Sequence, residues 1–120
     1  MTAMTRRVCF ALDLVDDAAL IAEYERAHLP GAVWPAVIDG IRAAGCEAME
    51  IWRTGDRLFM IAQVAADWPR PIAPPLAAAD ARWQAAMDRF QRRLPVAAAD
   101  EKWAPMTRIF ALDPEEDTDR

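Results

Sequence analysis

The chain has 120 residues, of which 54% are hydrophobic, which suits one domain with a single core and is too short for two. This apolar fraction excludes an intrinsically disordered chain and suggests more buried surface than one small monomer offers. The net charge of −5 gives no basic surface for nucleic acid. No apolar run approaches the roughly 18 residues of a membrane span. The opening "MTAMTRR" lacks the apolar stretch of a signal peptide.

The chain has few cysteine and histidine side chains that could bind a metal such as zinc. Cys9 and Cys46 fit neither a disulfide framework nor a CxxC spacing. His28 is the one histidine of the chain, and without a cysteine cluster it argues against a zinc site. The composition therefore predicts a soluble, cytoplasmic, metal-free domain that binds neither nucleic acid nor a membrane.

The first half of the chain passes from a strand pattern to two helical patterns. Residues 7–14 ("RVCFALDL") have the two-residue period of a strand, and Asp16 or Asp17 can cap the helix that follows. A Leu-Pro-Gly sequence ends this helix. A second helix is predicted with Pro35 in its first turn and Gly45 just after its end.

The second half begins with a hairpin signal. Residues 48–53 and 57–64 are strand-like and flank "TGD". Four prolines within residues 67–75 predict a stiff, irregular loop. The apolar spacing then predicts a helix from about residue 79 to residue 93, and residues 106–112 ("MTRIFAL") are predicted as a closing strand.

This order, β-α-β-β-α-β, is that of the ferredoxin-like α+β fold. We expect residues 1–120 to form a single domain, with a core of about 7–112 and a frayed acidic tail at 113–120. Helices cover only one face of such a sheet, yet residues 58–64 are apolar at nearly every position. The sequence therefore predicts a homodimer in which the second copy covers the other face, with an enclosed space between sheet and helices.

Tyr24 and His28 are the residues best suited to proton transfer. They are four positions apart, so one helix face carries both. Imidazole accepts and donates protons near neutral pH, and a phenol can orient a ligand hydroxyl or relay a proton. The alternative is that a histidine at a helix end only binds the last backbone carbonyls.

The chain contains five tryptophans, more than a core of this size requires. Flat aromatic faces stack against the C–H faces of sugars, and such pockets are otherwise apolar. Trp83 by itself is better explained as core, because it lies on the apolar stripe of the last helix. The five are Trp34, Trp52, Trp68, Trp83 and Trp103.

Glu50 places a carboxylate between Met49 and Ile51 in a predicted strand, so it faces one side of a largely apolar sheet. Such a group lies at an edge or has a polar partner. Ion pairing and ligand binding are both open for Glu50. The arginines that could pair with it are Arg53, Arg57 and Arg108.

Most of the chain resembles the L-rhamnose/L-fucose mutarotase family. The Tyr-x-x-x-His pair, the Trp-Pro soon after it and the tryptophan of the last helix are weak signals one by one and specific in this order. The resemblance implies a dimeric α+β barrel, no cofactor, and interconversion of the α and β anomers of a 6-deoxy sugar. The segments that carry it are "ALDLVDDAALIAEYERAH", "VWPAVIDGIRAAG", "MEIWRTGDRLFMI", "RWQAAMDRFQRRLP" and "EKWAPMTRIFAL".

The resemblance also implies roles for individual residues. His28 matches the catalytic proton donor of the family, and Tyr24 matches a sugar-contacting tyrosine that can complete the proton relay. Trp83 matches the first of two consecutive tryptophans that contact rhamnose. The second is Gln84 here, and another sugar-contacting tyrosine is Met49. The predicted site thus has Tyr24 and His28 as catalytic residues and Tyr24, Met49, Glu50, Trp83 and Gln84 as substrate-binding residues.

Two departures from the rhamnose enzymes bear on the substrate. Gln84 and Met49 both remove aromatic surface, and "ALDLVDD", "MEI" and "EKW" resemble the L-fucose branch, so L-fucose is the expected sugar and L-rhamnose the alternative. The loop between His28 and the Trp-Pro pair is two residues longer than usual for the family. A cofactor-free monooxygenase of the same fold and a non-catalytic ligand-binding dimer remain the alternatives of other classes.

Overall fold

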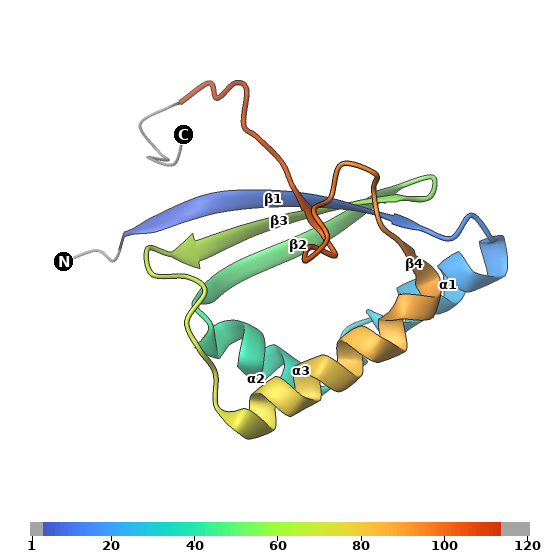
Figure 1. Ribbon diagram of the computed structural model, residues 1–120, viewed down its shortest axis with the longest axis horizontal. Coiled ribbons are helices and arrows are strands. Elements are labelled where there is room, and N and C mark those ends of the chain that lie inside the picture. Colours follow the sequence, from blue (N-terminus) through green and yellow to red (C-terminus); the bar gives the residue numbers. More distant parts are fainter. Residues whose placement is uncertain (1–3, 114–120) are drawn as a thin grey trace.

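The computed structural model of the protein describes residues 4–113. An antiparallel sheet forms one layer, and the α-helices of the described chain lie together on one of its faces (Figure 1). The elements in chain order are β1 (Thr5–Leu14), α1 (Ala18–Ala27), α2 (Pro35–Ala43), β2 (Cys46–Thr54), β3 (Arg57–Ala65), α3 (Pro74–Met87), a 3₁₀ turn (Asp88–Phe90), β4 (Gln91–Arg92) and β5 (Ala104–Pro105).

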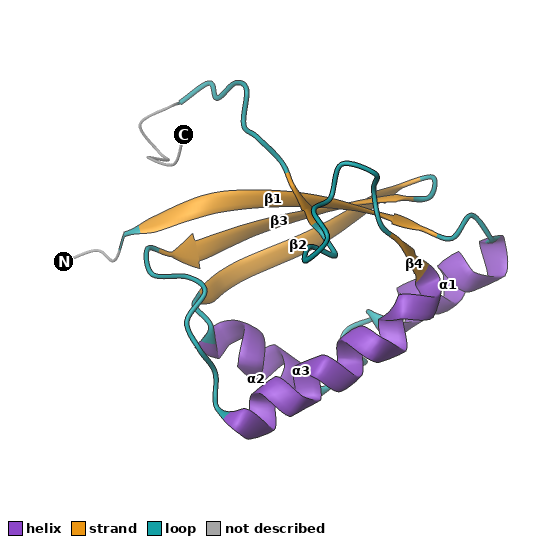
Figure 2. Cartoon of the chain, in the orientation of Figure 1, coloured by secondary structure: helices purple, strands orange, loops and turns teal. Residues whose placement is uncertain are grey.

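The sheet has the strand order β2-β3-β1-β4, and β5 pairs with β1 beside β4. Neighbouring strands are antiparallel throughout. This order confirms the predicted ferredoxin-like α+β fold. The first helical part of the motif is divided into α1 and α2, and α2 lies beside α3 (Figure 2).

The predicted helix signals are confirmed at both ends of the α1–α2 segment. Asp17, and not Asp16, is the N-cap of α1, and its carboxylate accepts a hydrogen bond from the backbone nitrogen of Leu20 at 3.0 Å. Pro35 is the first residue of α2. Gly45 follows the C-cap with a φ of +108°, a backbone conformation that glycine adopts without steric cost.

The helix α3 begins earlier and ends earlier than its predicted bounds of 79–93. It starts at Pro74, inside the segment predicted as an irregular loop. Proline suits the first helical position, because its missing N–H would have no partner there. The chain leaves the helix after Met87, and Gln91 already pairs with β1 as part of β4.

The predicted closing strand at 106–112 is wrong. Strand pairing ends at Pro105, and the backbone nitrogen of Met106 makes one more hydrogen bond to the oxygen of Cys9 at 2.8 Å. The chain then rises away from the sheet on the side opposite the helices (Figure 1). Ile109 and Phe110 are 94% and 76% exposed. Of the predicted acidic tail at 113–120, all but residue 113 lies outside the described residues.

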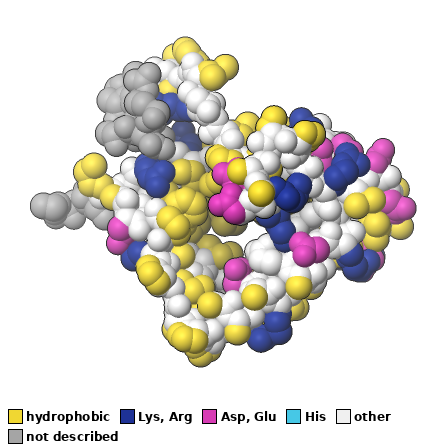
Figure 3. All heavy atoms as spheres, in the orientation of Figure 1, with side chains coloured by type: hydrophobic (Ala, Val, Ile, Leu, Met, Phe, Trp, Pro, Cys, Tyr) yellow, Lys and Arg dark blue, Asp and Glu magenta, His cyan; other side chains and the backbone are white. Residues whose placement is uncertain are grey.

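The core lies between the sheet and the helices. On the face drawn in Figure 3, hydrophobic side chains gather around the hollow between the two layers. Leu12, Leu14 and Val64 are the most deeply buried large side chains. Strand β3 alternates, so Leu58 faces the helices while Ile61 lies on the other face of the sheet and is 36% exposed. We call this helix-free side the open face. The main cluster under the helices is Leu14, Tyr24, Val37, Leu58, Trp83, Met87 and Phe90.

Candidate active site

A cavity of about 250 Å³ lies between the sheet and the helices, and we call it the sheet–helix cavity. The helices supply most of its polar and aromatic side chains, Gln91 of β4 and Trp103 between β4 and β5 add one of each kind, and β2 and β3 supply apolar ones. This arrangement is typical of small-ligand sites, which are mostly apolar with a few polar groups. Its lining residues are Tyr24, His28, Val33, Val37, Ile38, Ile41, Met49, Ile51, Met60, Asp80, Trp83, Gln84, Met87, Gln91 and Trp103.

His28 is the C-cap of α1, so its ring stands where the helix stops and the loop to α2 begins. Its Nδ1 lies 2.8 Å from the backbone oxygen of Tyr24. A carbonyl oxygen can only accept, so Nδ1 carries a hydrogen and Nε2 is the nitrogen left to exchange protons with a ligand. The ring centroid lies 4.4 Å from that of Tyr24 and 5.5 Å from that of Trp83. The bond to a helix carbonyl therefore uses only one of the two nitrogens.

Tyr24 is 4% exposed and lines the cavity. Burial raises the pKa of Tyr24 above its ordinary value of 10.0, and a hydrogen bond from Gln91 lowers it in part. The phenol therefore keeps its proton at neutral pH. The Nε2 of Gln91 donates to the phenol oxygen at 3.2 Å, which leaves the phenolic proton for another acceptor.

Gln91 is a cavity residue that the sequence analysis did not identify. It follows Phe90 at the start of β4, where the chain turns back to the sheet. Its Oε1 is buried and has no hydrogen-bond partner within residues 4–113. The sequence signal was hidden, because the predicted helix ran through this position to residue 93.

Trp83 is 8% exposed and stands in a chain of edge-to-face rings. The centroid of Trp34 lies 5.1 Å from it at an interplanar angle of 80°, and His28 contacts it with an angle of 74°. Trp34 is 38% exposed, so it lies over Trp83 at the surface. Trp103 also lines the cavity. Aromatic side chains therefore contribute to the lining although Gln84 and Met49 replace the aromatic residues of the rhamnose enzymes.

Gln84 is held on both sides of its side-chain amide. Its Nε2 donates to Asp80 Oδ1 at 3.3 Å, and its Oε1 accepts from Lys102 Nζ at 2.9 Å. Lys102 also donates to the backbone oxygen of Gln84 at 3.1 Å and pairs with Asp88 at 2.7 Å. Asp80 lines the cavity beside Gln84, and the sequence analysis did not single it out.

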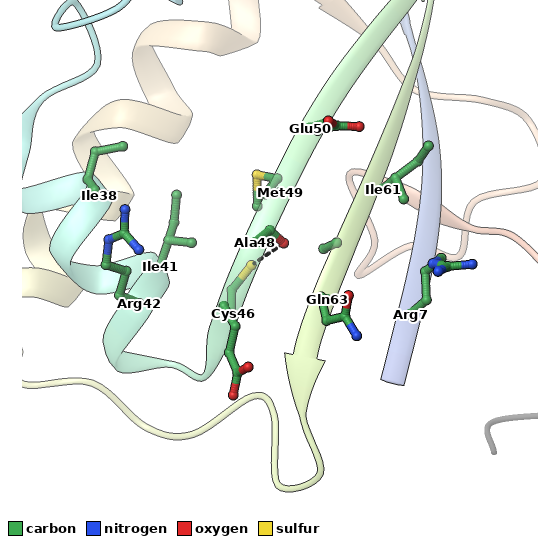
Figure 4. A pocket seen from close by; sticks show the side chains of 12 residues that line it. Arg7, Ile38, Ile41, Arg42, Cys46, Ala48, Met49, Glu50, Ile61 and Gln63 are labelled. Carbon is green, nitrogen blue, oxygen red and sulfur yellow. Dashed lines mark hydrogen bonds between the residues drawn. The ribbon is translucent and has the colours of Figure 1, made fainter. Parts of the chain in front are cut away.

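Met49 and Glu50 point to opposite faces of the sheet (Figure 4). Met49 lies toward α2 and lines the sheet–helix cavity. Glu50 lies on the open face, where its Oε1 accepts a hydrogen bond from Trp52 Nε1 at 3.0 Å. The structure thus brings together Tyr24, His28, Met49, Trp83 and Gln84, and it does not bring Glu50 to them.

Two of the arginines considered as partners of Glu50, Arg53 and Arg57, are engaged elsewhere. Arg53 pairs with Glu25 at 2.7 Å, and Arg57 pairs with Asp13 at 2.7 Å. Glu50 instead lines a hollow of about 560 Å³ at the β2 side of the sheet, together with Gln63. This larger hollow contains neither Tyr24, His28 nor Trp83, so we place the candidate active site in the smaller sheet–helix cavity.

Within residues 4–113, no three His, Cys, Asp or Glu side chains are grouped as metal ligands. The same residues contain no helix that is long and apolar enough to cross a membrane. The polar and aromatic groups that line the cavity within the described residues are one imidazole, one phenol, one carboxylate, two amides and two indoles.

Comparison with known proteins places the chain in a family. The family model described as L-rhamnose mutarotase matches residues 7–112. An L-fucose mutarotase of Xanthomonas campestris pv. campestris is 48% identical over 110 residues, covering 89% of this chain and 88% of the relative. A Dictyostelium discoideum protein named only as a UPF0734 protein is 33% identical over 110 residues, covering 86% of each chain.

A solved structure extends the likeness to the fold. The crystal structure of an L-rhamnose mutarotase from Formosa agariphila aligns with a TM-score of 0.59, covering 90% of this chain and 99% of that one. Its sequence identity of 16% supports the fold alone. The family match over residues 7–112, together with the 48% identical relative, shows that this chain belongs to the L-rhamnose mutarotase family.

Proposed function

We propose that this protein is a mutarotase that interconverts the α and β anomers of L-fucose. The observation that carries the proposal is the free Nε2 of His28 beside the phenol of Tyr24 in an aromatic-lined cavity. Membership of the family supports the reaction class, and the 48% identity to an L-fucose mutarotase supports the sugar.

The reaction requires the protein to supply only proton transfers. A proton leaves the anomeric hydroxyl at C1, a proton is delivered to the ring oxygen, and the bond between C1 and the ring oxygen breaks to give an open-chain aldehyde. Rotation about the bond from C1 to C2 presents the other carbonyl face, and the same steps in reverse close the ring. Positioned acids and bases accelerate such transfers by roughly 10² to 10⁴-fold each.

His28 is the proposed proton donor to the ring oxygen, acting through Nε2. Because Nδ1 is held by the oxygen of Tyr24, both proton states of the ring exchange their proton at the same atom. Tyr24, or an ordered water bound to it, completes the relay from the anomeric hydroxyl. Trp83 supplies an apolar ring for the C–H face of the sugar, and Met49 and Gln84 complete the walls.

The choice of sugar follows from the same walls. Gln84 and Met49 stand where aromatic residues are expected in rhamnose enzymes, and the polar amide of Gln84 suits hydroxyl recognition. The match of residues 7–112 to a family described as L-rhamnose mutarotase keeps L-rhamnose as the second candidate. These two sugars differ in the configuration of their ring hydroxyls, so they can be distinguished by the polar groups of the cavity.

A homodimer is the second part of the proposal. Apolar side chains lie on the open face, where Trp52 is 59% exposed and Ile61 is 36% exposed. The adjoining C-terminal segment exposes Ile109 and Phe110. A second copy that covers this surface would remove it from water. We also propose a cytoplasmic location, because a reducing compartment suits the free thiols of Cys9 and Cys46.

Replacement of His28 by Asn tests the reaction. We expect the H28N variant to return anomer exchange, measured by saturation-transfer NMR, toward the spontaneous rate, a loss of at least about 100-fold in kcat. The panel is L-fucose, L-rhamnose, D-galactose and D-ribose, with L-fucose exchanged fastest by the wild type. A circular dichroism spectrum and melting temperature equal to those of the wild type would show that the variant is folded.

Other outcomes lead to other functions. Wild-type exchange by H28N would contradict the role of His28. Sugar binding without accelerated exchange would support a non-catalytic module, and oxygen uptake with an aromatic or haem substrate would support a monooxygenase.

A further inference from the structure

We propose that Asp80 is a substrate-contacting residue of this site, which together with Gln84 recognises a hydroxyl group of the sugar away from the anomeric carbon. The inference rests on the proposed mutarotase function and deepens it by naming a specificity determinant. Asp80 provides the one acidic side chain in the lining of the sheet–helix cavity.

The position of Asp80 on α3 directs it into the cavity. Asp80, Trp83, Gln84 and Met87 follow the spacing i, i+3, i+4, i+7, and all four line the cavity. Trp83 and Met87 are buried, while Asp80 and Gln84 are half-buried. The apolar pair and the polar pair of α3 therefore face the same space, and a ligand in contact with the Trp83 ring lies within reach of both.

Gln84 and Asp80 form a fixed pair of opposite hydrogen-bonding character. Lys102 holds the Oε1 of Gln84 at 2.9 Å, so the amide nitrogen is directed toward Asp80, 3.3 Å away. Lys102 is itself held by Asp88 at 2.7 Å. The direction of the Gln84 amide is thus set by a neighbouring cation, and the pair is arranged before a ligand binds.

The pair keeps unused capacity for a ligand. Within residues 4–113, Gln84 is the hydrogen-bond partner of Asp80, and the bond uses Oδ1, so Oδ2 is left as an acceptor. The Gln84 nitrogen has a second N–H that this bond does not use. An acceptor and a donor side by side match a sugar hydroxyl, which donates one hydrogen bond and accepts another.

Asp80 and Gln84 are on a different helix from the residues proposed for proton transfer. His28 and Tyr24 belong to the end of α1, whereas Asp80 and Gln84 belong to α3. Proton transfer at C1 and the ring oxygen is proposed for the α1 residues. We therefore expect Asp80 to act in binding, so that its loss raises KM and leaves kcat nearly unchanged.

The test compares the wild type with the D80A variant on L-fucose and on its 2-, 3- and 4-deoxy analogues, by saturation-transfer NMR. With L-fucose we expect D80A to raise KM by about 10- to 100-fold, as for a lost hydrogen bond to a charged group, with kcat changed by less than about threefold. One of the three deoxy sugars should show a similar loss with the wild type. With D80A this sugar should be no worse than L-fucose, because the partner of the missing hydroxyl is already gone.

Two further variants make the result decisive. D39N changes an exposed aspartate of α2 that lies outside the cavity lining, and it should behave as the wild type. D80N keeps the size of the side chain, so a folded D80N with a raised KM confirms the effect should D80A fail to fold. Equal losses for every deoxy sugar in wild type and variants, or a fall in kcat at unchanged KM, would overturn hydroxyl recognition by Asp80 while leaving the mutarotase proposal in place. A wild type that accelerates no sugar would overturn both.

Discussion

Gln91 donates a hydrogen bond to the phenol oxygen of Tyr24, and this contact joins the start of β4 to the end of α1. We expect the Q91L variant to lower kcat by up to about 100-fold, because a phenol that loses its orienting donor points its proton less often at the ligand. KM should change little. The stability of the fold should change by less than about 1 kcal/mol, because the lost hydrogen bond is offset by removal of the buried, unpartnered Oε1.

Saturation-transfer NMR and thermal unfolding measure these two effects separately. The Y24F variant is the control, since Gln91 is argued to act through the Tyr24 hydroxyl. The double variant Y24F/Q91L should lose no more activity than Y24F alone. Additive losses would mean that Gln91 contacts the substrate or serves another residue.

The pairing of Tyr24 with His28 could be predicted at the residue scale, because a spacing of four residues brings side chains together on any helix. The contribution of Gln91 could not, because it depends on where α3 ends. Glu50 shows a different limit of prediction from the sequence. Adjacent strand residues face opposite sides, so Met49 and Glu50 could not both point toward the helices, and the alternation alone does not tell which face the helices cover.

Strand β1 is linked at its end to two neighbours through one carboxylate. Asp13 is 7% exposed and accepts hydrogen bonds from the Nε and Nη2 of Arg57 at 2.7 and 3.2 Å, and Arg92 of β4 lies 3.7 Å away. The hydrogen bond from Arg57 is the main cause that lowers the pKa of Asp13 below its ordinary 3.8, and burial opposes it.

This linkage predicts a loss of stability in acid. A lowered folded-state pKa means that the unfolded chain binds a proton more readily, so the stabilisation is complete above pH about 4 and disappears as the pH falls through the folded-state value. The D13N variant should be less stable than the wild type at pH 7, and the difference should shrink toward pH 2. Urea unfolding at several pH values measures it. D16N, at an exposed position, is the matched control, and an equal acid response in wild type and D13N would contradict the role of Asp13.

The elements that could be predicted from the sequence are those whose position is decided by a few neighbouring residues. The hairpin of β2 and β3 is confirmed, with Gly55 at a φ of +57° in its turn, and the caps of α1 and α2 are decided within a few residues. The start of α3 could not be predicted, because proline both interrupts and begins helices. The prediction of a strand at 106–112 was wrong. An alternating pattern forms a strand only where a neighbouring strand can pair with it, and β1 pairs with β5 only at Phe10 and Ala11.

For the whole molecule, the open face of the sheet is the feature that points to association. Ile61 lies on β3 between Glu50 of β2 and Cys9 of β1, so it is central to this face. We expect the wild type to be a dimer by size-exclusion chromatography with light scattering. The I61E variant should shift it to monomer, because a buried, unpaired carboxylate opposes association.

The matched control is L29E, which places the same charge on an exposed leucine in the loop after α1, within the helix layer. This variant should remain dimeric. A wild type that stays monomeric at all concentrations would contradict the proposed dimer, and a dimer that is retained in I61E would place the interface elsewhere.

Within residues 4–113, α1, α2, α3 and the sheet each contribute side chains to the sheet–helix cavity, which lies on the helix side of the sheet. Association through the open face would join two subunits on the sides that lie away from this cavity. Each subunit would then be self-sufficient, turning over sugar with simple saturation behaviour and no cooperativity. An assembly that pairs an intact subunit with an inert one would work at half the normal rate.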